Sequence, residues 1–302
     1  MASRPVPHGL IVNADDLGIH PSINAGIVSA YRRGILTSCT MLMTTAYFDQ
    51  TIRDHVRPQA LPIGVHLSLT LGKAVAPLSD VPDLVDADGN LKLAADRLIL
   101  SAFKGERGGA VLRQIGREFE AQLAIARDHG LRPTHADSHQ HVHMNPAIFR
   151  LLEELLPRFG IDRLRFSREA FHSFVLGPDL PDVMRRNNLA KWALLRWRAA
   201  ALHPALATTD DFFGVLYSGA VTKRAMLALL RAVAPGRSLE ICIHPGIPAP
   251  TGVRDYPRPG YNAFISAKAR QTEHDVLTDP DVAGLVRERG LDLRSFDGAI
   301  KV

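Results

Sequence analysis

The sequence predicts an α/β protein folded as one irregular (β/α) barrel spanning residues 1–302. Short apolar runs alternate with longer segments of helical periodicity, which is the pattern of parallel strands connected by helices. No repeat, low-complexity tract or composition break marks a linker, so we expect a single domain. Polar residues follow several apolar runs directly, where barrel enzymes carry their chemistry. An open doubly wound sheet is the alternative, and it also binds ligands at the carboxyl ends of its strands.

The first half of the chain shows the alternation most regularly. A strand is expected at 9–13, and the helix after it, 21–33, begins with Pro21 and is followed by Gly34, as helices commonly are. Apolar runs predict further strands, and amphipathic periodicity ended by glycine predicts the helices between them. In order, these are a strand at 38–43, a helix at 46–56, strands at 63–69 and 134–138, with a helix at 110–129 between them, a helix beginning at 145–146, and a strand at 163–166.

The second half is less regular. We expect a helical stretch at 181–202, an apolar strand-like run at 212–217, a helix at 222–233 and a strong strand at 238–243. The loop at 73–90 is rich in Pro, Asp and Gly and longer than most connections, which indicates a lid or a small subdomain.

Composition excludes several classes of protein. Apolar residues make up 46% and charged residues 22% of the chain, as in a globular protein with a full core. The net charge of +5 is spread along the sequence without a binding motif, so we expect no nucleic-acid partner. No targeting segment or run of about 18 apolar residues is present, which favours a cytoplasmic location. Cys39 and Cys242 are expected to be buried thiols, and a homodimer stays open.

An acidic pair, Asp15-Asp16, follows the apolar run 10–12 directly and therefore falls at the exit of the first strand. One carboxylate can bind a metal there while the other faces a water, as metal-assisted hydrolysis requires. The alternative is a turn-forming or helix-capping pair ahead of Pro21. A similar pair, Asp210-Asp211, precedes its apolar run, so we interpret it as a loop or strand-entry feature.

Histidines gather in two further places. His66 lies inside the apolar strand 63–69, where it requires either a buried partner or a ligand. In the segment 135–143, an extended backbone would place four side chains on one face and concentrate imidazoles that bind divalent metals. These four are Asp137, His139, His141 and His143.

His244 follows the strand 238–243 and precedes a Pro-Gly turn. It is either a loop histidine or, near a metal, a group able to protonate a departing amine.

These blocks resemble one family, the YdjC-like carbohydrate deacetylases, which include the chito-oligosaccharide deacetylase. The similarity lies in residues 12–18, 64–70, 133–144 and 244–246, in matching order and spacing, and it is absent from 171–209. The resemblance implies a barrel related to that of the polysaccharide deacetylases. It also implies a divalent ion held by Asp16, His66 and His139, with Asp15 as general base and His244 as general acid. Asp137, His141 and His143 would then orient the ligands.

Two imidazoles and a carboxylate favour Zn²⁺, and Mg²⁺ or Mn²⁺ stay possible. The resemblance implies deacetylation of a small carbohydrate, a chito-oligosaccharide or another N-acetylglucosamine glycoside. Alternatives are a lipid-linked N-acetylglucosamine such as an acetylated hopanoid glycoside, a metal-dependent phosphoesterase, and a non-catalytic metal-binding or sugar-binding barrel.

The stretch 181–202 mixes basic and apolar residues and holds both tryptophans, Trp192 and Trp197. An amphipathic helix packed on the barrel explains this pattern. A platform for a sugar ring, or for a membrane if the substrate is lipid-linked, is the other interpretation.

Overall fold

A parallel sheet of six strands forms the centre of the computed structural model, which describes residues 6–185, 187–249 and 252–301. The strand order is β4-β3-β2-β1-β6-β5, and every neighbouring pair is parallel. This arrangement follows from the alternation of apolar runs and helical segments, and it confirms the predicted α/β class. The strands are β1 (Gly9–Leu17), β2 (Ser38–Met41), β3 (Ile63–Leu67), β4 (Ala136–Ser138), β5 (Asp211–Phe213) and β6 (Ser238–Ile243).

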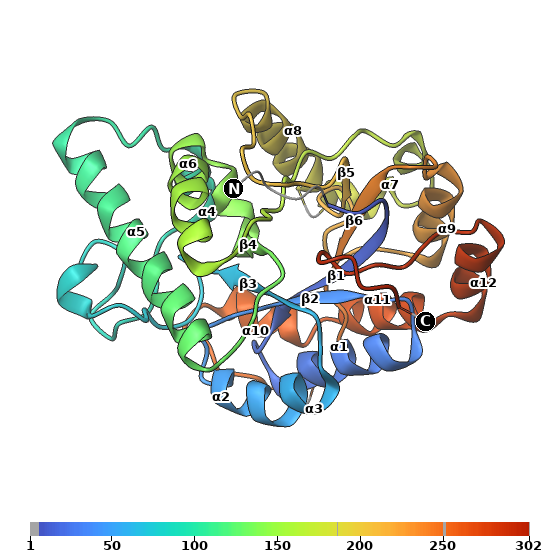
Figure 1. Cartoon of the computed structure of the whole chain (residues 1–302), viewed down its shortest axis with the longest axis horizontal. Coiled ribbons are helices and arrows are strands. Elements are labelled where there is room, and N and C mark those ends of the chain that lie inside the picture. Colours follow the sequence, from blue (N-terminus) through green and yellow to red (C-terminus); the bar gives the residue numbers. More distant parts are fainter. Residues whose placement is uncertain (1–5, 186, 250–251, 302) are drawn as a thin grey trace.

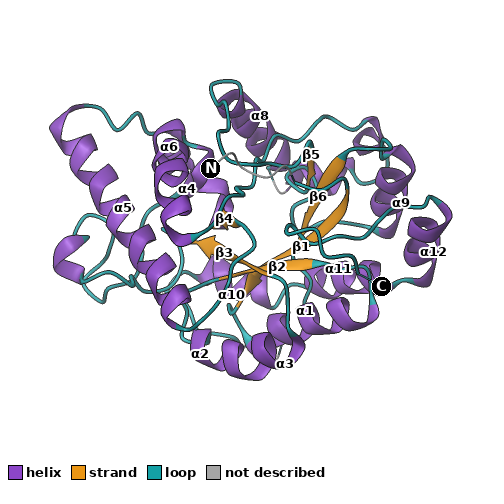
Figure 2. Cartoon of the chain, viewed as in Figure 1, coloured by secondary structure: helices purple, strands orange, loops and turns teal. Residues whose placement is uncertain are grey.

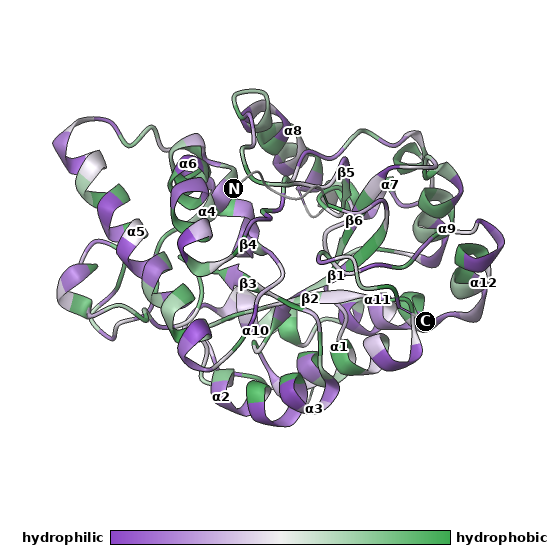
Figure 3. Ribbon diagram, viewed as in Figure 1, coloured by the Kyte–Doolittle hydropathy of each residue, from purple (hydrophilic) through white to green (hydrophobic). Residues whose placement is uncertain are grey.

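Helices surround the curled sheet on its outer side (Figures 1 and 2). The apolar faces of several helices pack on strands that are buried almost throughout, and one large core cluster runs from Leu10 to Val286. The helices are α1 (Pro21–Arg33), α2 (Phe48–Thr51), α3 (Arg57–Gln59), α4 (Ala95–Leu100), α5 (Gly105–Asp128), α6 (Pro146–Leu155), α7 (Leu180–Arg185), α8 (Asn188–Ala199), α9 (Lys223–Ala232), α10 (Pro259–Ile265), α11 (Lys268–Thr278) and α12 (Pro280–Glu288). In Figure 3 the green, apolar sides of several of these helices face the sheet.

The predicted strand at 163–166 is reduced to two isolated parallel bridges. Leu164 pairs with Ala136, the first residue of β4, and Arg163 pairs with Ala207. The segment still lies along the free edge of β4, because the Arg165 amide donates to Ala136 at 3.0 Å. It therefore extends the curl of the sheet although it is too irregular to form a strand.

One further local prediction was wrong, and another was only partly right. The segment 135–143 is not extended: β4 ends at Ser138, and a 3₁₀ segment runs from His139 to Met144 with Gln140 and His141 at positive φ. Its histidines therefore do not share one face, because the period of two ends with the strand. The helical stretch 181–202 is two helices, α7 and α8, separated around Asn187, whose φ is +57°.

The loop at 73–90 is closed by bridges between Lys73 and Asn90 and between Val85 and Leu91. It packs on α5, where the Glu118 carboxylate accepts the amides of Val75 and Ala76.

Both cysteines are free and buried, as predicted. No helix among the described residues combines the length and apolarity needed to cross a bilayer. The cytoplasmic location, the lack of a nucleic-acid partner and the homodimer stay predictions.

Candidate active site

A cavity of about 790 Å³ opens at the carboxyl ends of the strands. It collects most of the predicted site residues on its floor and adds walls from α4, α8, α10 and the turn after β5. Its lining residues include Asp15, Asp16, His66, His139, His141 and His244, together with Ala95, Ile99, Lys191, Leu194, Leu195, Val215, Ser218, Arg258, Tyr261 and Phe264.

The acidic pair diverges at the end of β1. Asp16 has φ +69°, a left-handed conformation, and the register of β1 against β2 shifts between Ala14 and Leu17. This local irregularity turns the two neighbouring carboxylates toward different partners. Asp15 faces Arg165, whereas Asp16 faces two histidines.

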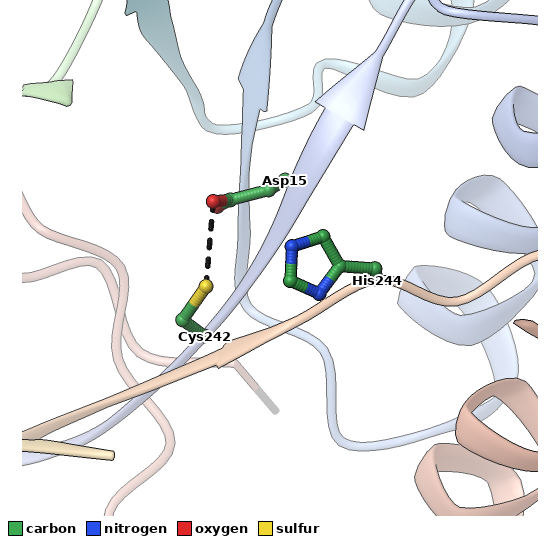
Figure 4. A group of neighbouring side chains, drawn as sticks. All are labelled: Asp15, Cys242 and His244. Atoms are coloured by element: carbon green, nitrogen blue, oxygen red, sulfur yellow. Dashed lines mark hydrogen bonds between the residues drawn. The ribbon is translucent and has the colours of Figure 1, made fainter. Parts of the chain in front are cut away.

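Asp15 is held by a dense set of donors. Its two oxygens accept from both terminal nitrogens of Arg165 at 2.7 Å. Further donors are Asn13 at 2.9 Å, Thr40 at 3.2 Å and the Cys242 thiol at 3.3 Å (Figure 4). Burial alone would raise the pKa of Asp15, but Arg165 and His66 outweigh burial and hold that pKa well below its usual value. Asp15 is therefore ionised at neutral pH.

His66 lies between two carboxylates. Its Nδ1 contacts Asp137 Oδ1 at 2.6 Å, and its Nε2 lies 3.4 Å from Asp16 Oδ1. Burial would lower the pKa of His66, but the carboxylates of Asp137 and Asp15 raise it to about 10. The contact with Asp137 fixes the ring so that Nε2 points to Asp16, as expected for a carboxylate that orients a histidine ligand.

His139 is the second histidine that approaches Asp16. Its Nδ1 contacts Thr70 Oγ1 at 2.7 Å, and its Nε2 lies 3.9 Å from Asp16 Oδ1. Burial lowers the pKa of His139 to about 4, so the ring is neutral at pH 7. A neutral imidazole is the form that binds metals, so His139 is ready for an ion, whereas His66 would release the proton that its raised pKa retains when an ion binds.

The atoms around Asp16 fit a divalent ion. Asp16 Oδ1 is buried and accepts no hydrogen bond within the described part of the chain. Burial would raise the pKa of Asp16, but His66 and His139 lower it to about 2, so the oxygen is charged. Two ligand atoms at about 2.1 Å from a tetrahedral ion lie about 3.4 Å apart. The distances of 3.4 and 3.9 Å from Asp16 Oδ1 to the two histidines are close to that value.

Two groups of ligand-type atoms, neither of them containing Asp16, lie within 4.8 Å of one another in the described part of the chain: Asp15 with Cys242 and His244, and Asp15 with His66 and Asp137. Both depend on Asp15, whose oxygens already receive the Arg165 guanidinium. A cation at either place would face that positive charge, which disfavours both groups.

His244 lies directly after β6, with its ring beside Asp15 and Cys242 (Figure 4). Its backbone amide donates to Glu273 at 2.7 Å, and its Nδ1 lies 4.0 Å from the same carboxylate. Burial and the neighbouring Arg270 cation lower the pKa of His244. The loop that carries it passes close to α1, because a Cβ at Gly26 would lie 2.4 Å from the Gly246 Cα. Glycine at 26 is therefore needed for this approach.

The other two predicted site histidines of the segment 135–143, His141 and His143, lie apart from the group around Asp16. His141 lines the cavity and its Nδ1 contacts Ser167 at 2.9 Å. His143 is fully buried behind the site, where Ser138 contacts its Nδ1 at 2.6 Å. Neither contacts Asp16, His66 or His139 through a hydrogen bond among the described residues, whereas Asp137 does contact His66.

Sequence reasoning missed three charged residues of this site. Arg165 and Glu240 are fully buried, and Arg165 Nε donates to Glu240 at 2.7 Å. Burial raises the pKa of Glu240 to about 7 despite that contact. Glu273 supports the His244 loop from α11. The sequence did contain a sign of Arg165 and Glu240: each is a charged residue inside an apolar strand-like run. Such a charge requires a buried partner.

Asp210 and Asp211 lie at the amino-terminal ends of the strands, away from the cavity. Asp210 accepts the Ser238 amide at the start of β6, and Asp211 pairs with Arg237. The prediction of a strand-entry feature is confirmed, because β5 begins at Asp211. Parallel strands whose carboxyl ends meet at the cavity all begin at the side away from it.

Comparisons with known proteins agree with the family resemblance found in the sequence. The model of the family described as YdjC-like protein matches residues 9–288. The chain is 30% identical to a carbohydrate deacetylase of Geobacillus stearothermophilus, covering 96% of this chain and 98% of that protein. It is 32% identical to a chitooligosaccharide deacetylase of Salmonella paratyphi B, covering 95% and 97%. A crystal structure from Enterococcus faecalis V583, of a candidate cellobiose-phosphate cleavage protein, aligns with a TM-score of 0.69 and 27% identity over 96% and 98% of the chains.

Proposed function

Because this chain belongs to the YdjC-like protein family, we propose that it is a metal-dependent hydrolase that removes the acetyl group from an N-acetylated sugar. One observation carries the proposal. Asp16 presents a charged, buried oxygen without a hydrogen bond in the described chain, and it lies between two histidines whose other nitrogens are already held. The relatives named carbohydrate and chitooligosaccharide deacetylase supply the reaction class.

Asp16, His66 and His139 would hold the divalent ion, with Zn²⁺ favoured by two imidazoles and a carboxylate and Mg²⁺ or Mn²⁺ as alternatives. When bound, such an ion polarises the amide carbonyl and lowers the pKa of water. Asp137 fixes His66, and Thr70 fixes His139, so both rings are oriented in advance. His141 faces the cavity beside these ligands, and His143 supports the 3₁₀ segment that carries His139.

Asp15 acts as the general base and accepts a proton from the water that attacks the acetyl carbonyl. The fork of Arg165 keeps the carboxylate ionised and in one orientation. Its low pKa makes Asp15 an intrinsically weak base. Its contribution therefore depends on being placed next to a water molecule whose own pKa is lowered in the site.

His244 acts as the general acid and passes a proton to the departing sugar nitrogen. Burial and Arg270 make its imidazolium a readier proton donor, because both lower its pKa. Glu273 accepts the backbone amide of His244 and so holds the chain where the ring lies beside Asp15 (Figure 4).

We propose that the whole chain is a single domain and an irregular barrel related to that of the polysaccharide deacetylases. The bridges of Arg163 and Leu164 support this relation, because they continue the curl of the sheet beyond β4 toward Ala207, which precedes β5.

A chito-oligosaccharide or another N-acetylglucosamine glycoside is the first substrate class. A lipid-linked N-acetylglucosamine is the second, and the walls of the cavity support it. Apolar side chains dominate those walls above the polar floor, namely Ile99, Leu194, Leu195, Val215 and Phe264. An apolar aglycone would bury surface there.

Acetate release tests the proposal. Purified protein is incubated with N-acetylglucosamine, N-acetylated chito-oligosaccharides and a lipid-linked N-acetylglucosamine, each with and without chelator. We expect chelator-sensitive acetate release from at least one of them. Phosphate release from phosphate esters instead would indicate a phosphoesterase, and sugar binding without any hydrolysis would indicate a non-catalytic barrel.

A further inference from the structure

Glu169 is a buried acid that neither the ion site nor the proton transfers use. It is 1% exposed, and its carboxylate accepts three successive backbone amides from the turn after β5. Gly214 donates to Oε1 at 3.3 Å, while Val215 and Leu216 each donate to Oε2 at 2.8 Å. A single side chain therefore satisfies the backbone donors of a buried turn.

The backbone carbonyl of the same residue holds helix α8. It accepts the Trp192 indole N–H and an Arg196 guanidinium N–H, each at 3.0 Å. At the beginning of α8, the Asn188 amide group donates to the carbonyls of Leu216 and Ser218 at 3.0 and 3.2 Å. Helix α8 and the turn 214–218 are thus joined at two points, and Glu169 is the point that binds both.

These two elements together form one wall of the cavity. They contribute Asn187, Lys191, Leu194, Leu195, Val215 and Ser218 to its lining. None of these side chains belongs to the ion site or to the Asp15 and His244 pair. The wall therefore faces the part of a substrate that lies beyond the reacting acetamide.

We propose that Glu169 is a positioning residue that fixes α8 and the turn 214–218 as one substrate-binding wall. This inference rests on the proposed deacetylase function. Without the carboxylate, three buried amides lose their acceptor, and the turn must move to find others. Such a movement displaces Val215 and Ser218 relative to Leu194 and Leu195, so it changes substrate binding more than the chemical step. The burial that raises the pKa of Glu169 to about 7 agrees with its enclosed position.

The test compares Glu169→Ala with the conservative Glu169→Gln, which keeps a carbonyl oxygen for Val215 and Leu216. The background is Trp197→Phe, so that Trp192 is the one remaining tryptophan and reports on the wall by its fluorescence. Glu118→Ala is the matched control, because Glu118 is equally buried and also accepts backbone amides, in the loop packed on α5.

We expect Glu169→Ala to shift Trp192 emission to longer wavelength and to raise KM for a chito-oligosaccharide about tenfold or more. The kcat and the affinity for Zn²⁺ should change less than about threefold, and Glu169→Gln should restore most of the KM. The control should lose thermal stability without a change in Trp192 emission or KM.

An unshifted Trp192 in a folded Glu169→Ala protein would overturn the proposal, and so would a fall in kcat at constant KM. If the parent protein releases no acetate, the deacetylase function fails, yet the fluorescence comparison still decides whether Glu169 holds the wall.

Discussion

Arg165 forms a bidentate ion pair with Asp15, in which each terminal guanidinium nitrogen lies 2.7 Å from one carboxylate oxygen. The same guanidinium contacts Asp137 at 2.6 Å and Glu240 at 2.7 Å, and none of the four side chains is exposed beyond a few per cent. The proposed general base, Asp15, and the carboxylate that orients His66 therefore share Arg165 as a counter-ion.

Arg165→Met should destabilise the protein by about 3–5 kcal/mol, because it leaves buried carboxylates without their partner. The measurement is urea unfolding. Arg158→Met is the control: Arg158 pairs with Glu120 at the surface, and an exposed pair contributes about 0–1 kcal/mol. Arg165→Lys should fold but lose at least about tenfold in kcat, since lysine cannot hold both oxygens of Asp15. Wild-type turnover in Arg165→Lys would contradict this role.

The two acids of the first strand should separate in function. Asp15→Asn should abolish turnover while the protein still binds its ion, and Asp16→Asn should weaken ion binding first, because Asp16 lies between the two histidines. Turnover and chelator competition measure the two effects. Asp210→Asn is the control, since Asp210 caps the start of β6 at the far edge of the sheet. Normal turnover in Asp15→Asn would remove it as the base.

Removing the ion should lower both activity and stability. An ion whose free concentration is about 100 times its Kd stabilises the native state by about 3 kcal/mol. Chelation should therefore lower Tm, and added Zn²⁺ should restore it. Elemental analysis identifies the native metal. A protein whose Tm and acetate release ignore chelator, and which carries no divalent ion, would refute the metal-dependent mechanism.

Stability should depend on the protonation of Glu169. Burial raises its pKa in the folded protein from 4.5 to about 7, so the folded state binds a proton more tightly than the unfolded chain does. The stabilisation is complete below about pH 4.5 and is lost as pH rises through about 7, with an upper limit of about 3 kcal/mol. Glu169→Gln should reduce the pH dependence of the unfolding free energy between pH 4.5 and 7. An unchanged slope in denaturant unfolding would show that Glu169 titrates normally.

A lipid-linked substrate would bring α8 to a membrane. Trp197 on this helix is 59% exposed, and Arg198 lies over its ring at 4.3 Å. In that case the protein should sediment with anionic liposomes, less so at high salt, and Trp197→Ala should weaken the binding. Leu78→Ala removes an exposed apolar side chain from the 73–90 loop and serves as the control.

A soluble oligosaccharide as substrate predicts a different result for the same helix. Trp192→Ala or Trp197→Ala should then raise KM for long substrates more than for N-acetylglucosamine. If both variants lose only stability and liposomes do not bind, α8 serves packing alone.

The sequence by itself determined the parallel α/β class and the ends of the strands that carry Asp15, Asp16, His66 and His244. Apolar runs followed by polar residues are local signals, and parallel strands bring their carboxyl ends to one edge whatever their order in the chain. For the same reason, the start of β5 could be assigned to the opposite ends of the strands. That assignment distinguished Asp210 from the site residue Asp15.

Only the tertiary structure decided which side chains meet. The left-handed residues Gln140 and His141 ended the extended pattern that would have aligned three histidines, because a 3₁₀ segment replaced it. Arg165 and Glu240 are separated by 75 residues, so no local pattern could pair them with each other. A buried charge must find its counter-charge wherever the fold places one, and that pairing is a property of the packed core rather than of any segment.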